Sequence, residues 1–295
     1  MDTQAAAGWQ HDGSFYWRQS EVYALTSALV VGRRALWLVD PGFLPREVAD
    51  LRRLVDRLAA RQRPRARYLL LSHADFDHIL GVHAFPDFKV VAAQAAHRRL
   101  ERSLRRGRRI DGSLLIDRPA SAYQAFPIGE AVARRTAALP DAILAPISSH
   151  TRDGLLGLLT GYDGRRILVV GDHLSALEGP HLTDWPGTLP SFEALAGLLA
   201  QADWLMVGHG PPARRAEARQ RLRDDLSYLL GLLRRRAGGA SETQALALPA
   251  PPGPSPEESH RYHGDNVHRL YQSVEPAAAS GLANRLEALL QAAQG

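Results

Sequence analysis

The stretch that decides the fold is Tyr68-Leu69-Leu70-Leu71-Ser72-His73-Ala74-Asp75-Phe76-Asp77-His78-Ile79-Leu80-Gly81. It begins as a short apolar run, which is typical of a buried strand, and ends in four polar side chains within six residues. His73, Asp75, Asp77 and His78 are therefore expected on a loop held by a rigid element. Two imidazoles and two carboxylates this close together are costly to bury, and one or two divalent metal ions would offset that cost.

Three further candidates stand just past other apolar runs: His150 follows residues 142–146, Asp172 follows 166–170 and His209 follows 204–207. Strand ends from two halves of a chain can converge at one edge of a pair of sheets. The combined set would suit two metal ions that share one carboxylate, with water or hydroxide in the remaining position. The seven candidate ligands are His73, Asp75, Asp77, His78, His150, Asp172 and His209.

The rest of the chain alternates between strand-like and helix-like segments. Apolar runs around turn residues predict two hairpins, over residues 22–39 and 154–170. Apolar spacing predicts helices over 46–60, 192–200 and 214–236, and 95–106 is expected to be a basic helix. Residues 107–129 show little periodicity and are expected to be a loop with short strands. This mixture predicts an α/β fold in which two facing sheets are covered on the outside by helices.

Composition narrows the choice of partners and metal ligands. The chain has no cysteine, so a metal must be held by histidines and carboxylates. No apolar run approaches the ~20 residues that span a bilayer, and Met1 to Gln4 lacks the start of a signal peptide. We therefore expect a cytoplasmic protein without a membrane partner. The net charge is +5, but the scattered arginines fit solvated helix faces better than a nucleic-acid-binding stripe.

On these motifs the chain resembles the metallo-β-lactamase-fold hydrolase superfamily over about residues 22–212. The motifs that carry the resemblance are Asp40-Pro41-Gly42, His73-x-Asp75-x-Asp77-His78, Ser149-His150-Thr151-x-Asp153-Gly154, Gly171-Asp172 and Gly208-His209-Gly210. The resemblance implies an αβ/βα four-layer sandwich, with two facing mixed sheets and helices outside.

The resemblance also implies roles for the candidate ligands. His73, Asp75 and His150 would hold a first divalent ion, and Asp77, His78 and His209 a second, with Asp172 bridging both. Hydroxide made available by the metals would attack an electrophilic carbon or phosphorus. Asp77 would also be catalytic, by orienting that hydroxide or carrying its proton.

Asp75 departs from the family pattern, which has histidine at this position. A carboxylate is a harder ligand than imidazole and adds a negative charge. Zinc is the metal implied by the family, while Asp75 shifts the expectation toward iron or manganese. We predict two ions with Asp75 ligating. A centre with one ion, held at the second position, is the alternative.

Outside the main motifs the sequence offers weaker candidates. His173 directly follows Asp172 and is a candidate for substrate contact, with simple packing as the equal alternative. Asp40 is expected to fix a turn beside the centre by hydrogen bonds. The predicted division is a hydrolase domain over 1–236, a flexible linker over 237–256 and a helical extension over 257–295 packed on the same domain. His263 in that extension is a second candidate for substrate contact.

The expected function is metal-dependent hydrolysis of a small ester, thioester, lactone or related compound. Two alternatives stay open: a phosphodiesterase or nuclease of the same superfamily, and a non-catalytic ligand-binding or sensor protein with a partly decayed metal site. The expected partner is a small-molecule substrate, and a homodimer is compatible with the sequence. Nucleic acid is not the expected partner, and fold membership does not convey the substrate.

Overall fold

Two mixed β-sheets face each other in this protein, whose structure is a computed structural model describing residues 8–62 and 66–294. The first seven residues of the predicted domain and Gly295 lie outside the described residues. The first sheet has the order β1 Gln10–Asp12, β2 Phe15–Gln19, β3 Thr26–Val31, β4 Ala35–Val39, β5 Ala66–Leu70, β6 Lys89–Ala93, β7 Glu130–Val132. The second has the order β12 Ala213–Arg214, β11 Trp204–Met206, β10 Arg166–Val169, β9 Gly154–Thr160, β8 Ala142–Ile147.

Each sheet combines antiparallel and parallel pairs. In the first sheet β1 to β4 pair antiparallel, and β4 to β7 pair parallel. In the second sheet β10 and β11 are parallel, and the other pairs are antiparallel. The two predicted hairpins are confirmed as β3–β4 and β9–β10. Parallel strands end at the same edge, so β4, β5 and β6 of the first sheet and β10 and β11 of the second bring their following loops to common edges.

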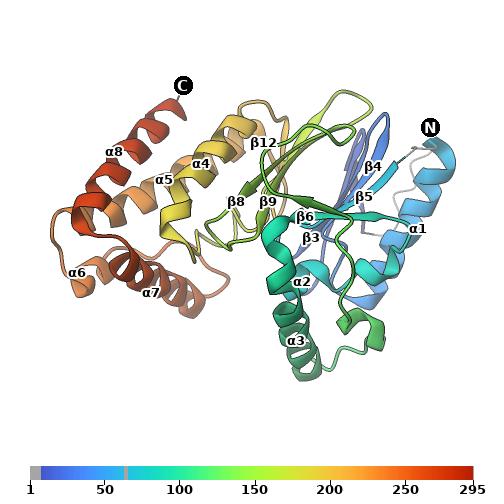
Figure 1. Cartoon of the computed structure of the whole chain (residues 1–295), viewed down its shortest axis with the longest axis horizontal. Helices are drawn as coiled ribbons and strands as arrows, with labels where there is room; N and C mark the ends of the chain where they lie inside the picture. The colour runs from blue at the N-terminus through green and yellow to red at the C-terminus, as the bar shows by residue number, and fades with distance from the viewer. Residues whose placement is uncertain (1–7, 63–65, 295) are drawn as a thin grey trace.

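Helices cover the outer face of each sheet (Figure 1). They are α1 Pro45–Gln62, α2 Phe76–Ile79, α3 His97–Ser113, α4 Trp185–Leu199, α5 Arg215–Ala237, α6 Glu242–Leu246, α7 Pro256–Ser273 and α8 Pro276–Ala292, with short 3₁₀ turns η1 Val82–Ala84, η2 Gln94–Ala96 and η3 Ala120–Tyr123. In Figure 1, α1 lies on the side of the first sheet, and α4, α5 and α8 lie on the side of the second. The predicted four-layer αβ/βα sandwich is therefore confirmed.

Apolar packing between the two sheets and under the helices holds the sandwich together. Between the sheets, the fully buried side chains include Trp37, Leu70, Leu159 and Met206. Strand alternation sends the neighbouring side chains outward, so Leu69 packs with the helices that cover the first sheet. The strand that precedes the His73 to His78 loop is thus buried on both faces, which explains its unbroken apolar run.

Two segments differ from the sequence expectation. The helix expected over 95–106 continues as α3 to Ser113, and Gly107 lets it approach α2, since a Cβ there would lie 2.8 Å from the Cβ of Phe76. Residues 237–256, expected to be a flexible linker, contain α6, which begins with a capping box between Ser241 and Gln244. Ala245 of α6 is buried, so this segment is packed rather than unstructured.

The C-terminal residues form two helices that pack on the second sheet's helical layer. Leu286 of α8 belongs to the same apolar cluster as Leu222 and Leu229 of α5. Arg234 of α5 and Glu287 of α8 form an ion pair at 2.7 Å. The placing of a domain boundary at residue 236 stays a prediction. Within the described residues, no helix is long and apolar enough to cross a membrane.

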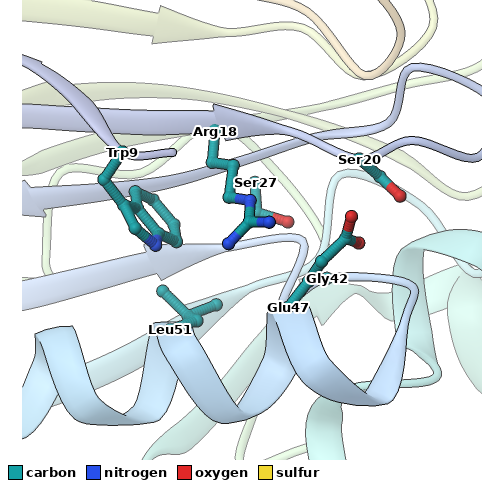
Figure 2. A pocket seen from close by; sticks show the side chains of 7 residues that line it. All are labelled: Trp9, Arg18, Ser20, Ser27, Gly42, Glu47 and Leu51. Carbon is teal, nitrogen blue, oxygen red and sulfur yellow. The ribbon is translucent and has the colours of Figure 1, made fainter. Parts of the chain in front are cut away.

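A small cavity lies between α1 and the strands β2 and β3 (Figure 2). It is lined by Trp9, Arg18, Ser20, Ser27, Gly42, Glu47 and Leu51. Arg18 pairs with Asp50 at 2.9 Å, and Glu47 accepts hydrogen bonds from the backbone nitrogens of Glu21 and Leu44. Its charged groups already have partners, and none of its lining residues is a predicted metal ligand. We assign it to the packing of α1.

We predict that Leu286→Ala lowers the free energy of unfolding by about 2–4 kcal/mol, because it opens a cavity in the core shared by α5 and α8. Urea denaturation of the full chain measures this. Arg285→Ala, one residue earlier on the exposed face of α8, is the control and should change stability by less than about 0.5–1 kcal/mol. Equal, small effects of both changes would mean that α8 is not part of the cooperative core.

Candidate metal centre

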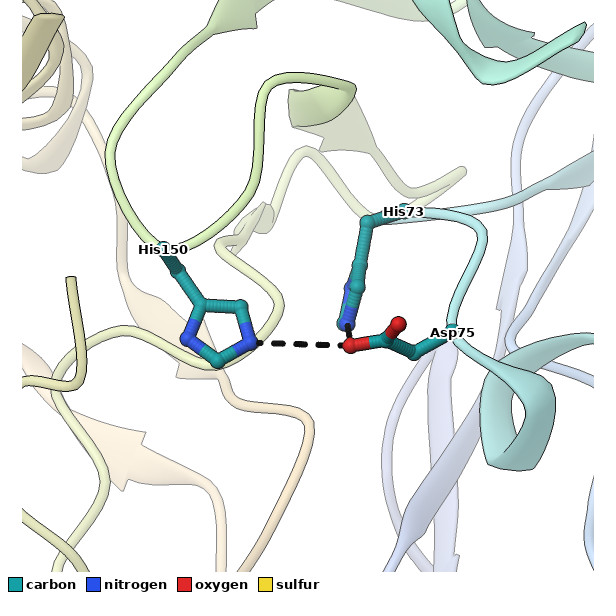
Figure 3. A group of neighbouring side chains, drawn as sticks. All are labelled: His73, Asp75 and His150. Carbon is teal, nitrogen blue, oxygen red and sulfur yellow. Dashed lines mark ion pairs between the residues drawn. The ribbon is translucent and has the colours of Figure 1, made fainter. Parts of the chain in front are cut away.

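All seven predicted ligands lie together at the facing edges of the two sheets. His73 and Asp75 follow β5, and Asp77 and His78 lie on α2. The other three come from the second sheet, where His150, Asp172 and His209 follow β8, β10 and β11. Figure 3 shows His73, Asp75 and His150 pointing toward one another from separate loops. The structure thus brings together residues as far apart in the sequence as His73 and His209.

One group of ligand atoms consists of His73, Asp75 and His150. The Oδ2 atom of Asp75 lies 3.3 Å from His73 Nε2 and 3.8 Å from His150 Nε2. The Oδ2 atom of Asp172 lies 3.5 Å from His73 Nε2 and 3.3 Å from His150 Nε2. Atoms this close could all bind one ion.

A second group consists of Asp77, His78 and His209. Asp77 Oδ2 lies 3.7 Å from His78 Nε2 and 3.4 Å from His209 Nε2. Asp172 also reaches this group, with Oδ1 3.3 Å from His78 Nε2 and Oδ2 3.5 Å from His209 Nε2. The Asp172 carboxylate therefore stands between the two groups, as a shared ligand would.

Three buried polar atoms at this place show that the side chains fit a cation. His73 Nε2, His78 Nε2 and Asp172 Oδ1 have no hydrogen-bond partner among the described residues. Buried polar atoms in folded proteins nearly always have partners, and leaving one unpaired costs about 1–3 kcal/mol. Imidazole nitrogens and carboxylate oxygens are ligands for zinc, iron and manganese, so divalent ions held by the two groups would satisfy these three atoms.

The Nδ1 atom of three of the four imidazoles is fixed by a hydrogen-bond acceptor. His78 Nδ1 donates to Asp40 Oδ2 at 2.9 Å, His150 Nδ1 to the carbonyl of His181 at 2.8 Å, and His209 Nδ1 to the carbonyl of Tyr23 at 2.8 Å. In the neutral ring these bonds place the proton on Nδ1, so the lone pair is on Nε2, which faces the centre. Partners of this kind orient metal-binding histidines and make them more basic.

Asp40 ties the first loop to the sheet, as the sequence predicts. Its carboxylate accepts hydrogen bonds from Ser72 N at 2.9 Å and Ser72 Oγ at 2.7 Å, besides that of His78. Asp40 has a φ of 42°, in the left-handed region that aspartate tolerates better than most residues. Asp40 is fully buried, and it holds Ser72 and the His78 ring in place by these hydrogen bonds.

Arg99 of α3 compensates for the carboxylate that replaces histidine at position 75. It pairs closely with Asp75 Oδ1 and also lies 3.1 Å from Asp153 Oδ1. Asp153 in turn accepts a hydrogen bond from Ala74 N at 2.9 Å. One oxygen of Asp75 is thus held by the arginine, while Oδ2 remains directed at His73 and His150. Arg99 belongs to none of the sequence motifs, so the motifs alone do not predict its contact with Asp75.

The close charges shift the pKa values of the ligands in opposite directions. Burial lowers the pKa of His150, but Asp172 and Asp75 outweigh it and raise that pKa to about 10. Burial also lowers the pKa of His209, but the negative charges of Asp172 and Asp77 outweigh it and raise that pKa to about 9. Burial favours protonation of Asp172, yet the imidazoles of His209 and His78 hold the pKa of Asp172 well below its usual value.

His173 is packed rather than directed into the centre. Its Nδ1 donates to the carbonyl of Val170 at 2.9 Å, and its Nε2 accepts from Ser149 Oγ at 2.5 Å. Burial, with the neighbouring His150, lowers the pKa of His173 to about 4, so the ring stays neutral. Of the two roles expected for His173, the structure shows packing. Its hydrogen bond with Ser149 supports the loop that carries His150.

His263 is not brought to the centre. Its ring is buried on α7, and its Nδ1 lies 2.9 Å from the hydroxyl of Tyr228 on α5. The preceding residue, Tyr262, faces the other way and stacks on His181 with ring centroids 4.6 Å apart. Successive helical residues point about 100° apart, so the C-terminal extension presents Tyr262 instead of His263 near the His150 loop.

Glu178 is a further carboxylate that the motifs do not reveal. One of its oxygens lies within 4.8 Å of ligand atoms of both Asp172 and His209. Burial, then the negative charge of Asp172, raises the pKa of Glu178. Glu178 lies in the loop between β10 and α4, and only its position six residues after Asp172 could have pointed to it.

Histidines and carboxylates at the facing edges of two sheets define a metal-binding protein with the αβ/βα sandwich fold. The sequence model of the Metallo-beta-lactamase superfamily matches residues 22–261, which is most of the chain. The chain therefore belongs to the metallo-β-lactamase superfamily, whose members are generally hydrolases. A comparison with curated proteins found no match.

Solved structures show the same fold at low sequence identity. The metallo-β-lactamase FIM-1 from Pseudomonas aeruginosa, solved in a mono-zinc form, has a TM-score of 0.52 and 17% identity, covering 72% of this chain and 92% of that one. The B3 metallo-β-lactamase BLEG-1 has a TM-score of 0.52 and 18% identity, covering 70% and 96%. A metallo-β-lactamase from Erythrobacter litoralis has a TM-score of 0.52 and 16% identity, covering 72% and 93%. These likenesses concern the fold.

We predict that Zn²⁺ added to the metal-free protein at pH 8 releases about two protons or more per chain. His150 and His209 have pKa values of about 10 and 9, so both are protonated at pH 8 and must lose a proton to bind metal. A pH-indicator titration measures the release. His150→Ala should release about one proton fewer, while His97→Ala, at an exposed position, should match the unchanged chain. Release of less than one proton by all three proteins would contradict the assigned protonation.

Proposed function

We propose that this protein is a metal-dependent hydrolase that acts on a small ester, thioester, lactone or related compound. The observation that carries the proposal is Asp172, whose carboxylate lies between two groups of histidine and aspartate ligands and has a buried, unpartnered oxygen. Membership of a superfamily that consists mainly of hydrolases supports it. A scaffold that kept only structural roles would not need three buried ligand atoms without partners.

The proposed cofactors are two divalent ions. His73, Asp75 and His150 would hold one, the Asp77, His78 and His209 group would hold the other, and Asp172 would contact both. Zinc is the first choice by family. Iron or manganese is the second choice, because Asp75 adds a hard oxygen ligand. When bound, such ions lower the pKa of water and polarise a carbonyl oxygen.

The chain's own residues position the reactants. Asp77 lies at the partly exposed side of the centre, where its carboxylate could orient the attacking water, take its proton and deliver it to the leaving group. His73 and His78 are almost fully buried and keep bulk water away from the inner side. Arg99 keeps Asp75 in place from the side of α3.

The charge around the centre favours neutral carbonyl substrates over phosphodiesters. Four carboxylates, Asp75, Asp77, Asp172 and Glu178, surround the proposed ions and reduce the positive potential that would attract a polyanion. The arginines of α3 do not offset this fully, since Arg99 is paired with Asp75 and Asp153. The nuclease alternative is therefore the less favoured one.

We predict that Asp77→Asn lowers kcat/KM by about 10²–10⁴-fold, because the amide cannot accept the proton of the attacking water. The assay uses zinc-, iron- or manganese-loaded protein with p-nitrophenyl acetate, S-phenyl thioacetate, a γ-lactone and bis-p-nitrophenyl phosphate. Asp117→Asn, at an exposed position, should leave turnover unchanged. Turnover of only the phosphodiester would favour the nuclease alternative, and turnover of no substrate by the unchanged chain would favour the non-catalytic one.

We predict that the unchanged chain binds two ions and that Asp75→Ala binds one tightly. Removing this carboxylate deprives the first group of one ligand and leaves Arg99, now paired with Asp153 alone, as a cation beside it. Metal analysis after gel filtration gives the stoichiometry. One tightly held ion in both proteins would show that Asp75 is not a ligand and that the centre is mononuclear.

A further inference from the structure

Glu178 stands on the open side of the metal centre. The side chains of His73 and His78 are 2% and 0% exposed, so these residues form the closed inner side. The side chains of Asp75, His150 and His209 are 24%, 14% and 12% exposed, so these residues lie on the more open side of the centre. Glu178 lies next to His209 and Asp172, and its own burial is intermediate. Its carboxylate therefore borders the approach to the centre.

The C-terminal segment holds the loop of Glu178 in place. The backbone nitrogen of Gly179 donates to the carbonyl of Pro252 at 2.6 Å. A Cβ at Gly179 would lie only 2.2 Å from the Cβ of Pro251, so only glycine allows this close approach. The next residues are tied by Asn266 of α7, which donates to the carbonyl of Pro180 at 2.6 Å.

Further bonds fix the same loop at both ends. Asn266 Oδ1 accepts from Leu182 N at 2.8 Å, and Asn266 is fully buried. On the other side of Glu178, Ser175 Oγ donates to the carbonyl of His209 at 2.7 Å. A loop with these anchors holds its side chains at a defined distance from the metal ligands. The C-terminal helices thus shape the entrance to the centre, and Tyr262 lies on its rim through its stacking on His181.

We propose that Glu178 determines substrate specificity, by binding an ammonium or other hydrogen-bond donor next to the reacting carbonyl and by repelling a carboxylate there. A charge-assisted hydrogen bond to such a donor would orient the carbonyl over the centre. A carboxylate in the same place would meet the like charges of Glu178 and Asp172. This inference names the substrate class of the centre and rests on the proposed hydrolase function.

Binding of three small chelators tests this without any turnover. Acetohydroxamate, glycine hydroxamate and malonate monohydroxamate share one metal-binding group and carry a neutral, cationic or anionic substituent beside it. Their affinities are measured from the visible spectrum of the Co²⁺-loaded protein. The unchanged chain should prefer the cationic probe. Glu178→Gln should weaken the cationic probe about tenfold, strengthen the anionic probe about tenfold and leave the neutral probe within about twofold.

Controls separate this role from others. Glu130→Gln, a partly exposed carboxylate paired with Lys89 on the first sheet, should behave as the unchanged chain. Equal shifts for all three probes, or none, in Glu178→Gln would overturn the proposal. Loss of a metal ion in Glu178→Gln would overturn it too, since Glu178 would then be a metal ligand. If no ester is hydrolysed but the probe preferences follow the prediction, the hydrolase proposal fails and this inference about binding stands.

Discussion

The structure depends on one electrostatic constraint: four imidazoles and three carboxylates share a single, mostly buried place where two sheets meet. Such a set is unfavourable without compensation, because burial penalises each charge and the carboxylates repel one another. In the protein alone, the neighbouring carboxylates stabilise the protonated rings of His150 and His209 and raise their pKa values to about 10 and 9. A divalent cation can take the place of those protons.

The fold makes this arrangement rigid by joining the loops of the two sheets. Asp153 of the second sheet's side accepts from Ala74 of the first and pairs with Arg99. His209 of the second sheet's side donates to Tyr23, which precedes β3 of the first. These ties cross the interface between the sheets, so the apolar core between them and the ligand cluster support each other. A loose interface would move His150, Asp172 and His209 away from the candidate ligands on the first sheet and so divide both groups.

The sequence predicts that the seven candidate ligands lie together, because they come shortly after buried strands whose ends meet at common edges of the sheets. The sequence does not predict the positions of Arg99 and Glu178 beside the centre, since no motif marks an arginine on a helix or a glutamate in a loop. His263 contacts Tyr228 on α5 instead of the centre, because adjacent helical positions face different directions, and its neighbour Tyr262 is the one that stacks on His181. The segment 237–256 looks like a linker by composition, yet the Ser241 capping box starts α6 within it.

The central claim is that both sheets contribute to one dinuclear metal centre around Asp172. Anomalous X-ray diffraction from crystals of the metal-loaded protein tests it most directly. The account predicts two anomalous peaks, one beside His73, Asp75 and His150 and the other beside Asp77, His78 and His209, each in contact with Asp172. Peaks only elsewhere on the protein, or no peak between these side chains, would contradict it.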